Sequence, residues 1–124
     1  MSATAVNFFF EVREQIKLYH WQTKVYSRHK ATDDVISALD QSIDQYVETY
    51  MGKYGRPKMT SATNTIRVTN MSETSIVKCI KSYITYMNTT LVKKLDPSRD
   101  SDLFNVRDEM MGQLNKLLYL FTLH

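Results

Sequence analysis

The chain has 124 residues, of which 43% are hydrophobic, and a formal net charge of +3 at pH 7. Its length and composition fit one domain, residues 1–124, with its own core, and its single cysteine excludes an intramolecular disulfide framework. No signal-peptide pattern is evident, and the longest apolar run is too short to cross a bilayer. We therefore expect a soluble cytoplasmic protein.

Two helices are predicted in the first half of the chain, where apolar residues recur at spacings of three and four. The first is predicted at about residues 5–24. The second is predicted at about residues 32–53, with Thr32 as its N-cap. Gly55 and Pro57 are expected to end it, because glycine permits a left-handed exit and proline cannot continue a helix.

Two further helices are predicted after a polar connection. Residues 58–72 are rich in Thr, Ser and Asn and predict a loop, after which Ser72 is expected to cap a third helix at about residues 73–93. The turn at residues 96–98 separates it from a last helix that begins near Ser101.

These patterns predict an all-α four-helix bundle. Glycine and proline are scarce, and each predicted helix has one apolar stripe. The connection between the second and third helices is the long one, so these two helices can run parallel, as they do in ferritin-like bundles.

The second predicted helix carries an unusual set of polar residues. His29, Asp33, Asp44 and Glu48 stand at spacings of four, eleven and four. Eleven residues make nearly three whole turns, so the four side chains share one stripe beside the apolar stripe. His20, near the end of the first helix, could supply another imidazole. Imidazole and carboxylate groups together are typical ligands of a non-haem iron centre.

An alternative for each of these residues is an ordinary solvated helix face, and His29 and Asp33 form a common surface pair. A di-iron site inside the bundle is not expected, because the sequence has no Glu-x-x-His motif.

The segments that carry these residues resemble Dps-type miniferritins of the ferritin-like superfamily. Residues 19–24, Tyr-His-Trp-Gln-Thr-Lys, look like the His-Trp-Asn-Val-Lys stretch that closes the first helix of that family. Residues 29–48 match its spacing of His, three residues, Asp, ten residues, Asp, three residues, Glu. Residues 113–121 resemble its last helix.

The resemblance implies ferroxidase activity: oxidation of Fe²⁺ by peroxide or oxygen, followed by mineral storage. Zinc or manganese are alternative occupants. It places His20, His29 and Asp33 of one chain with Asp44 and Glu48 of a neighbour. The protein would then be a homo-oligomer, at least a dimer and in the full family pattern a dodecameric cage.

The same resemblance places Trp21 close to the iron, as part of the catalytic site. The residues before Val6 lack the lysine-rich tail with which some members bind DNA, so we expect no DNA binding.

Two alternatives remain at this point. One is a non-catalytic ferritin-like protein that serves in assembly, for example inside a larger particle. The other is a binding module for a polyanion, because residues 49–94 hold eight basic residues and one acid. Ordinary solvated faces explain that charge distribution equally well.

Overall fold

The structure is a computed structural model that describes residues 3–123. Over this range it is all-helical, which confirms the predicted class. Its four helices are α1 (Ala3–Gln22), α2 (Tyr26–Tyr54), α3 (Ser75–Asn88) and α4 (Ser101–Leu120). None of the helices described is long and apolar enough to cross a membrane.

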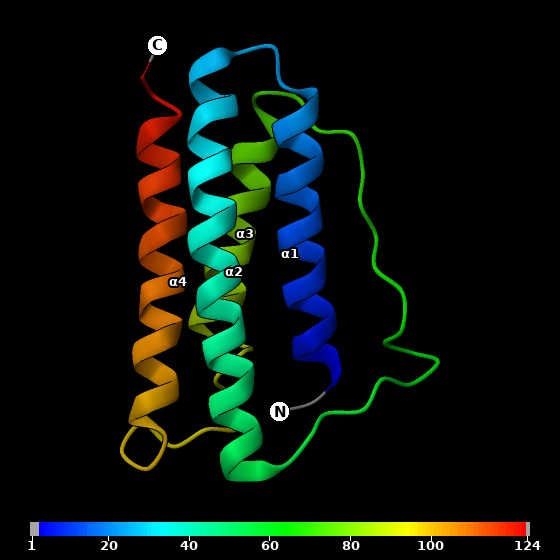
Figure 1. The fold of residues 1–124 in the computed structure, drawn as a ribbon, viewed down its shortest axis with the longest axis vertical. Coiled ribbons are helices and arrows are strands. Elements are labelled where there is room, and N and C mark those ends of the chain that lie inside the picture. The colour runs from blue at the N-terminus through cyan, green and yellow to red at the C-terminus, as the bar shows by residue number, and fades with distance from the viewer. Residues whose placement is uncertain (1–2, 124) are drawn as a thin grey trace.

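The helices lie side by side along the long axis of the molecule (Figure 1). The short turn between α1 and α2 makes these two helices antiparallel, and the connection between α3 and α4 does the same for that pair. The chain between α2 and α3 returns along the outside of α1 to the opposite end of the bundle (Figure 1). As a result α2 and α3 run in the same direction, as the long connection led us to expect.

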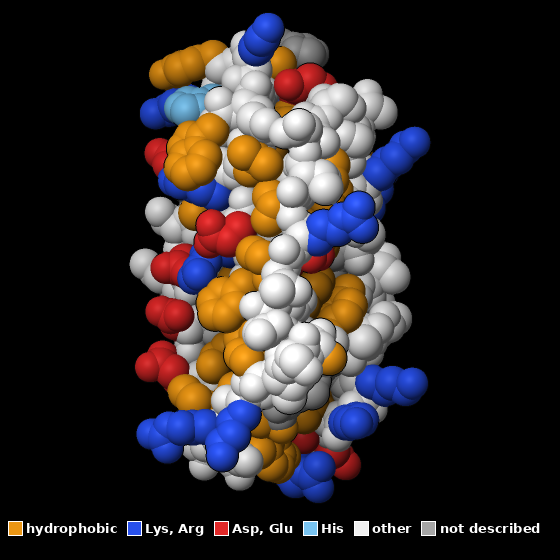
Figure 2. All heavy atoms as spheres, turned by 90° about the vertical axis from the view of Figure 1, so that its right-hand side faces the viewer, with side chains coloured by type: hydrophobic (Ala, Val, Ile, Leu, Met, Phe, Trp, Pro, Cys, Tyr) orange, Lys and Arg blue, Asp and Glu red, His pale blue; other side chains and the backbone are white. Residues whose placement is uncertain are grey.

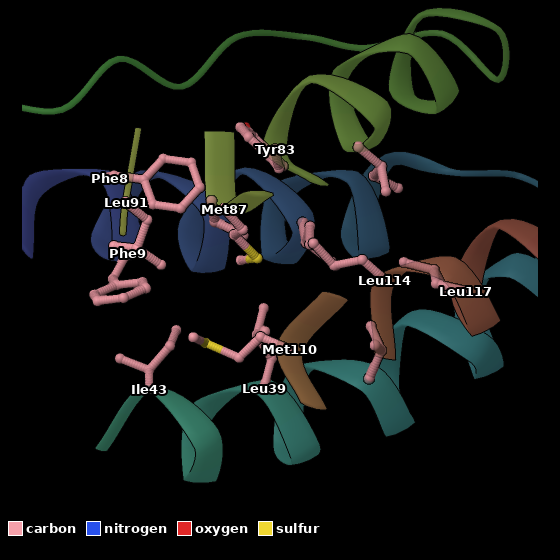
Figure 3. Close-up of a cluster of buried hydrophobic side chains, with 14 of the residues drawn as sticks. Phe8, Phe9, Leu39, Ile43, Tyr83, Met87, Leu91, Met110, Leu114 and Leu117 are labelled. Carbon is pink, nitrogen blue, oxygen red and sulfur yellow. The ribbon is translucent and has the colours of Figure 1, made fainter. Parts of the chain in front are cut away.

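All four helices contribute to a single core (Figure 3). Ile16, Leu39, Ile80, Met110 and Leu114 are fully enclosed, and each belongs to the apolar stripe of its helix. Aromatic rings of α1 pack against two other helices at one end of the bundle. Phe8 stacks on Tyr86 of α3, and Phe9 packs edge-on against Tyr46 of α2. The three- and four-residue spacing therefore identified the core correctly.

Helix α2 begins earlier than its sequence predicts. It starts at Tyr26, so Thr32 is a buried residue within the helix and the prediction that it is the N-cap is wrong. The Thr32 hydroxyl bonds back to the carbonyl of Arg28 at 2.8 Å, an arrangement that a helix interior tolerates. At the other end, Gly55 leaves the helix with a φ of 89°, as predicted.

Helix α3 is shorter than predicted and ends at Asn88 instead of near Lys93. The hydroxyls of Thr85 and Thr89 bond back to carbonyls one turn earlier, and the N–H of Leu91 bonds to the carbonyl of Tyr86. The bond from Leu91 spans five residues instead of four, so regular helical pairing ends here. At the start, α3 begins at Ser75 with Thr74 as its N-cap, so the predicted start at residue 73 with Ser72 as the cap is two residues early; the Ser72 hydroxyl still accepts from the N–H of Ser75 at 3.0 Å.

Residues 56–72, called the strap here, cross the surface of the bundle as an extended segment. Three polar side chains one turn apart on α1 bind its backbone: Asn7, Glu11 and Gln15. Gln15 bonds to both the N–H and the carbonyl of Thr69, at 3.0 and 2.9 Å. Figure 2 shows the strap as a largely uncharged polar band with hydrophobic side chains on either side.

Candidate functional site

The stripe predicted on α2 lies within one continuous helix. His29, Asp33, Asp44 and Glu48 all belong to α2, and all four are exposed. Because α2 begins at Tyr26, His29 is part of the regular helix, although the sequence placed it before the helix start. The predicted ligands therefore flank the core rather than occupy it.

His20 and His29 are brought together where α1 turns into α2. Their imidazole rings stack with centroids 4.0 Å apart and planes 15° apart. The His20 ring is buried, whereas the His29 ring lies on the surface. Nine residues separate them in the sequence, and the short turn between the helices closes that distance.

Each histidine bonds to the backbone of the other. Nδ1 of His20 lies 2.9 Å from the carbonyl oxygen of His29, and Nδ1 of His29 lies 2.9 Å from the carbonyl oxygen of His20. A carbonyl oxygen can only accept, so both Nδ1 atoms carry a proton. In the neutral state each ring then has its lone pair on Nε2, the arrangement by which proteins prepare a histidine for a metal ion.

Thr32 supports this pair and was missed as a site residue by the sequence reasoning. Its hydroxyl lies 2.9 Å from Nδ1 of His20, and it also donates toward the carbonyl of Arg28. Its position near the predicted helix start indicates only a cap. The signal for a second role is its position three residues after His29, on the face that packs against α1.

Asp33, Asp44 and Glu48 are not gathered around the histidines. Across residues 3–123, no group of three His, Cys, Asp or Glu side chains stands close enough together to hold a metal ion. Asp44 follows Asp33 by eleven residues, which is about 16 Å along a helix. That distance exceeds the reach of one metal ion with bonds near 2 Å, so Asp44 and Glu48 cannot complete the His29 site within the same chain.

Two exposed aromatic residues flank the histidine pair. Trp21 and Tyr26 each leave 68% of their surface in solvent. The ammonium of Lys17 lies 5.5 Å from the centre of the Trp21 ring, and Tyr26 stacks loosely on His29. Trp21 follows His20 directly in the sequence, and its exposed indole ring is available to a second molecule.

A cluster of hydrogen bonds around Glu73 fixes the same end of the bundle. Its carboxylate accepts from the hydroxyls of Tyr19 and Thr23 and lies 3.2 Å from the guanidinium of Arg28. Arg28 also donates to the Glu73 carbonyl at 2.7 Å. Burial and the bond to Glu73 raise the pKa of Tyr19. This cluster joins α1, α2 and the start of α3, and no local sequence pattern indicates it.

The chain matches, over residues 20–121, a protein family described as a family of unknown function (DUF5856). It belongs to this family. The matched range includes every predicted ligand, from His20 to Glu48. The chain is also 30% identical over 104 residues to an uncharacterized 14.6 kDa protein in the mobD-ri intergenic region of Enterobacteria phage T4. That alignment covers 84% of this chain and 74% of the relative. No solved structure matches significantly.

Proposed function

We propose that the protein is a ferritin-like, miniferritin-type iron protein whose site is completed by a second copy of the chain. His20, His29 and Asp33 of one protomer, which do not form a three-ligand group in the single chain, would move together on Fe²⁺ with Asp44 and Glu48 of another protomer. Fe²⁺ is then the substrate, oxidised by peroxide or oxygen, and Zn²⁺ or Mn²⁺ are alternative occupants.

The observation that carries this proposal is the hydrogen bonding of the two histidines. Both Nδ1 atoms bond to backbone carbonyls, so both neutral rings have Nε2 free for a cation. The parallel run of α2 and α3 adds support, because the same topology is found in ferritin-like bundles.

A second copy is required by the geometry of α2. Asp44 and Glu48 lie more than about four helical turns beyond His29, and they are exposed along the same stripe. Two such helices packed antiparallel would bring the histidine end of each next to the acidic end of the other. The exposed rings of Trp21 and Tyr26 provide apolar surface for that contact.

The direct test is anaerobic titration with Fe²⁺, followed by the fluorescence of Trp21, which is the one tryptophan of the chain. We expect saturable quenching in the wild type and its loss in Asp33→Asn. The matched control is Asp34→Asn, which removes the same charge from the adjacent exposed position of α2 and should titrate like the wild type.

Oligomeric state provides the second measurement. Native mass spectrometry should show a dimer or a larger assembly, and Asp44→Asn with Glu48→Gln should abolish Fe²⁺ binding without dissociating it. A monomer at micromolar concentration, or unchanged binding in the double variant, would exclude the shared site.

A non-catalytic assembly role is the second candidate. It is favoured by the absence of a three-ligand group in residues 3–123 and by the exposed aromatic rings near the turn between α1 and α2. A protein of this kind would form the oligomer but bind Fe²⁺ no more tightly than the Asp33→Asn variant does.

A further inference from the structure

A cavity of about 600 Å³ lies at the end of the bundle opposite the histidine pair. The start of α1, the end of α2, the end of α3 and the connection after α3 surround it. Its volume is within the range of about 300–1,000 Å³ that is typical of small-molecule sites. None of the predicted metal ligands lines it, so it is independent of the iron site.

Four tyrosines form the walls of this cavity: Tyr46, Tyr50, Tyr54 and Tyr86. Core packing holds two of the rings in place. Tyr46 packs edge-on against Phe9 at 5.4 Å, and Tyr86 stacks on Phe8 at 3.9 Å. Tyr50 and Tyr54 pack against each other at 4.9 Å. Because Tyr46 is buried, the aromatic surface open to a ligand comes from Tyr50, Tyr54 and Tyr86, and a planar ring could pack on it.

Two of these tyrosines have hydroxyls with no hydrogen-bond partner among the described residues. Tyr46 is only 1% exposed, and burial raises its pKa to about 12, so its hydroxyl keeps its proton at neutral pH. Burial also raises the pKa of Tyr86, without any bond to its hydroxyl. Neither oxygen belongs to the fully enclosed, unpartnered polar atoms of the described residues, so both hydroxyls are open to water or to a ligand with polar ring atoms.

Three cations line the same cavity: Lys93, Lys94 and Arg99. Among the described residues, no acidic side chain pairs with Lys93 or Lys94. Arg99 lies 3.6 Å from Asp100, but that carboxylate is already paired with Lys53 and bonded to Tyr54. The first turn of α1, which reaches the cavity through Thr4 and Ala5, contains no acidic residue. The opening is therefore positively charged and suits an anionic group.

We propose that this cavity binds a nucleoside phosphate, with the base against the tyrosine rings and the phosphates at Lys93, Lys94 and Arg99. Purely apolar ligands would leave the cations unused, and a simple inorganic anion would leave the aromatic walls unused. Bases stack on tyrosine rings, and phosphates pair with lysine and arginine, so one molecule uses both parts of the site.

The test is isothermal titration calorimetry of the full chain with ATP, inorganic triphosphate and adenosine in parallel. We expect ATP to bind best, because it alone has both the ring and the phosphates. Lys93→Ala with Lys94→Ala should weaken ATP binding about tenfold or more. Both lysines are exposed, so the fold should be retained, as circular dichroism can verify.

The matched control is Lys78→Ala with Lys81→Ala. It removes the same charge from exposed positions of α3 that do not line the cavity, and it should change the Kd less than twofold. Tyr50→Leu should reduce the preference for ATP over inorganic triphosphate. Equal binding of ATP and triphosphate, equal effects of both double-lysine variants, or binding of oligonucleotides without binding of ATP would each overturn the proposal.

Discussion

The two connections that flank α3 are held in contrasting ways. The connection between α3 and α4 places Leu91 and Val92 in the core and encloses the carboxylate of Asp100. The strap before α3 has no buried residue, and side chains of α1 bind its backbone instead. A connection can thus be fixed by its own side chains or by polar side chains of a neighbouring helix.

Asp100 is the centre of the shorter connection, and its loss should have the largest effect. Its carboxylate accepts from the Tyr54 hydroxyl and from the N–H of Asp96, and it lies 3.2 Å from the ammonium of Lys53. Asp100→Ala leaves all three groups without this partner, and we expect the Tm to fall by about 10 °C. Thermal melting followed by circular dichroism measures this.

Asp102→Ala is the control for this effect. Asp102 also pairs with Lys53, at 2.8 Å, but it lies on the surface. An exposed pair contributes little, so its Tm should stay within about 2 °C of the wild type. An equal fall in Tm in the two variants would show that the buried Asp100 stabilises the connection between α3 and α4 no more than the exposed Asp102 does.

Gln15 has the corresponding role for the strap. Its amide is 2% exposed and bonds to both backbone groups of Thr69. Gln15→Ala should cost about 1–3 kcal/mol of unfolding free energy, because it removes two hydrogen bonds and leaves a cavity. Urea unfolding gives the magnitude, and trypsin cleavage after Arg67 reports whether the strap is released.

Gln22→Ala is the comparison for the strap. Gln22 reaches only the exposed side chain of Asn70. Gln22→Ala should change neither the free energy of unfolding nor the rate of cleavage after Arg67. If trypsin cleaves after Arg67 equally fast in the two variants, the role given to Gln15 is wrong.

The sequence predicted the class, the four helices and the parallel run of α2 and α3, because each depends on apolar spacing and on the length of one connection. It also placed four candidate ligands on one exposed stripe. The strap contacts escaped prediction, since Gln15 and Thr69 are 54 residues apart and their bond uses the backbone of Thr69, which no side-chain pattern reveals. Thr32 was misjudged because a threonine near a helix start is usually a cap.

Lowering the pH should have a smaller effect on the stability of the fold. The bonds from Tyr54 and from the backbone of Asp96 lower the pKa of Asp100 to about 2, below its ordinary value of 3.8. A lowered pKa stabilises the folded state at pH values above 4, and this contribution is lost as the pH falls through about 2. The difference in Tm between the wild type and Asp100→Asn should therefore shrink between pH 5 and pH 2. A constant difference over this range would contradict the assignment.

The smallest effect is expected at the end of the strap. The Glu73 side chain is 43% exposed, so its pairing with Arg28 at 3.2 Å is screened by solvent. Glu73→Gln keeps an acceptor for the hydroxyls of Tyr19 and Thr23 and should cost about 1 kcal/mol or less. Urea unfolding of this variant beside Asp100→Asn compares the two carboxylates directly, and a larger loss for Glu73→Gln would reverse the ranking proposed here.

The strap is, in effect, a peptide ligand that the protein supplies to its own first helix. Both of its ends are covalently fixed, one to α2 and the other to α3, so its effective concentration at α1 is about millimolar or higher. Individually weak bonds from Asn7, Glu11 and Gln15 are then sufficient to keep it in place. The same sequence supplied as a free peptide would have no such advantage and would bind only weakly.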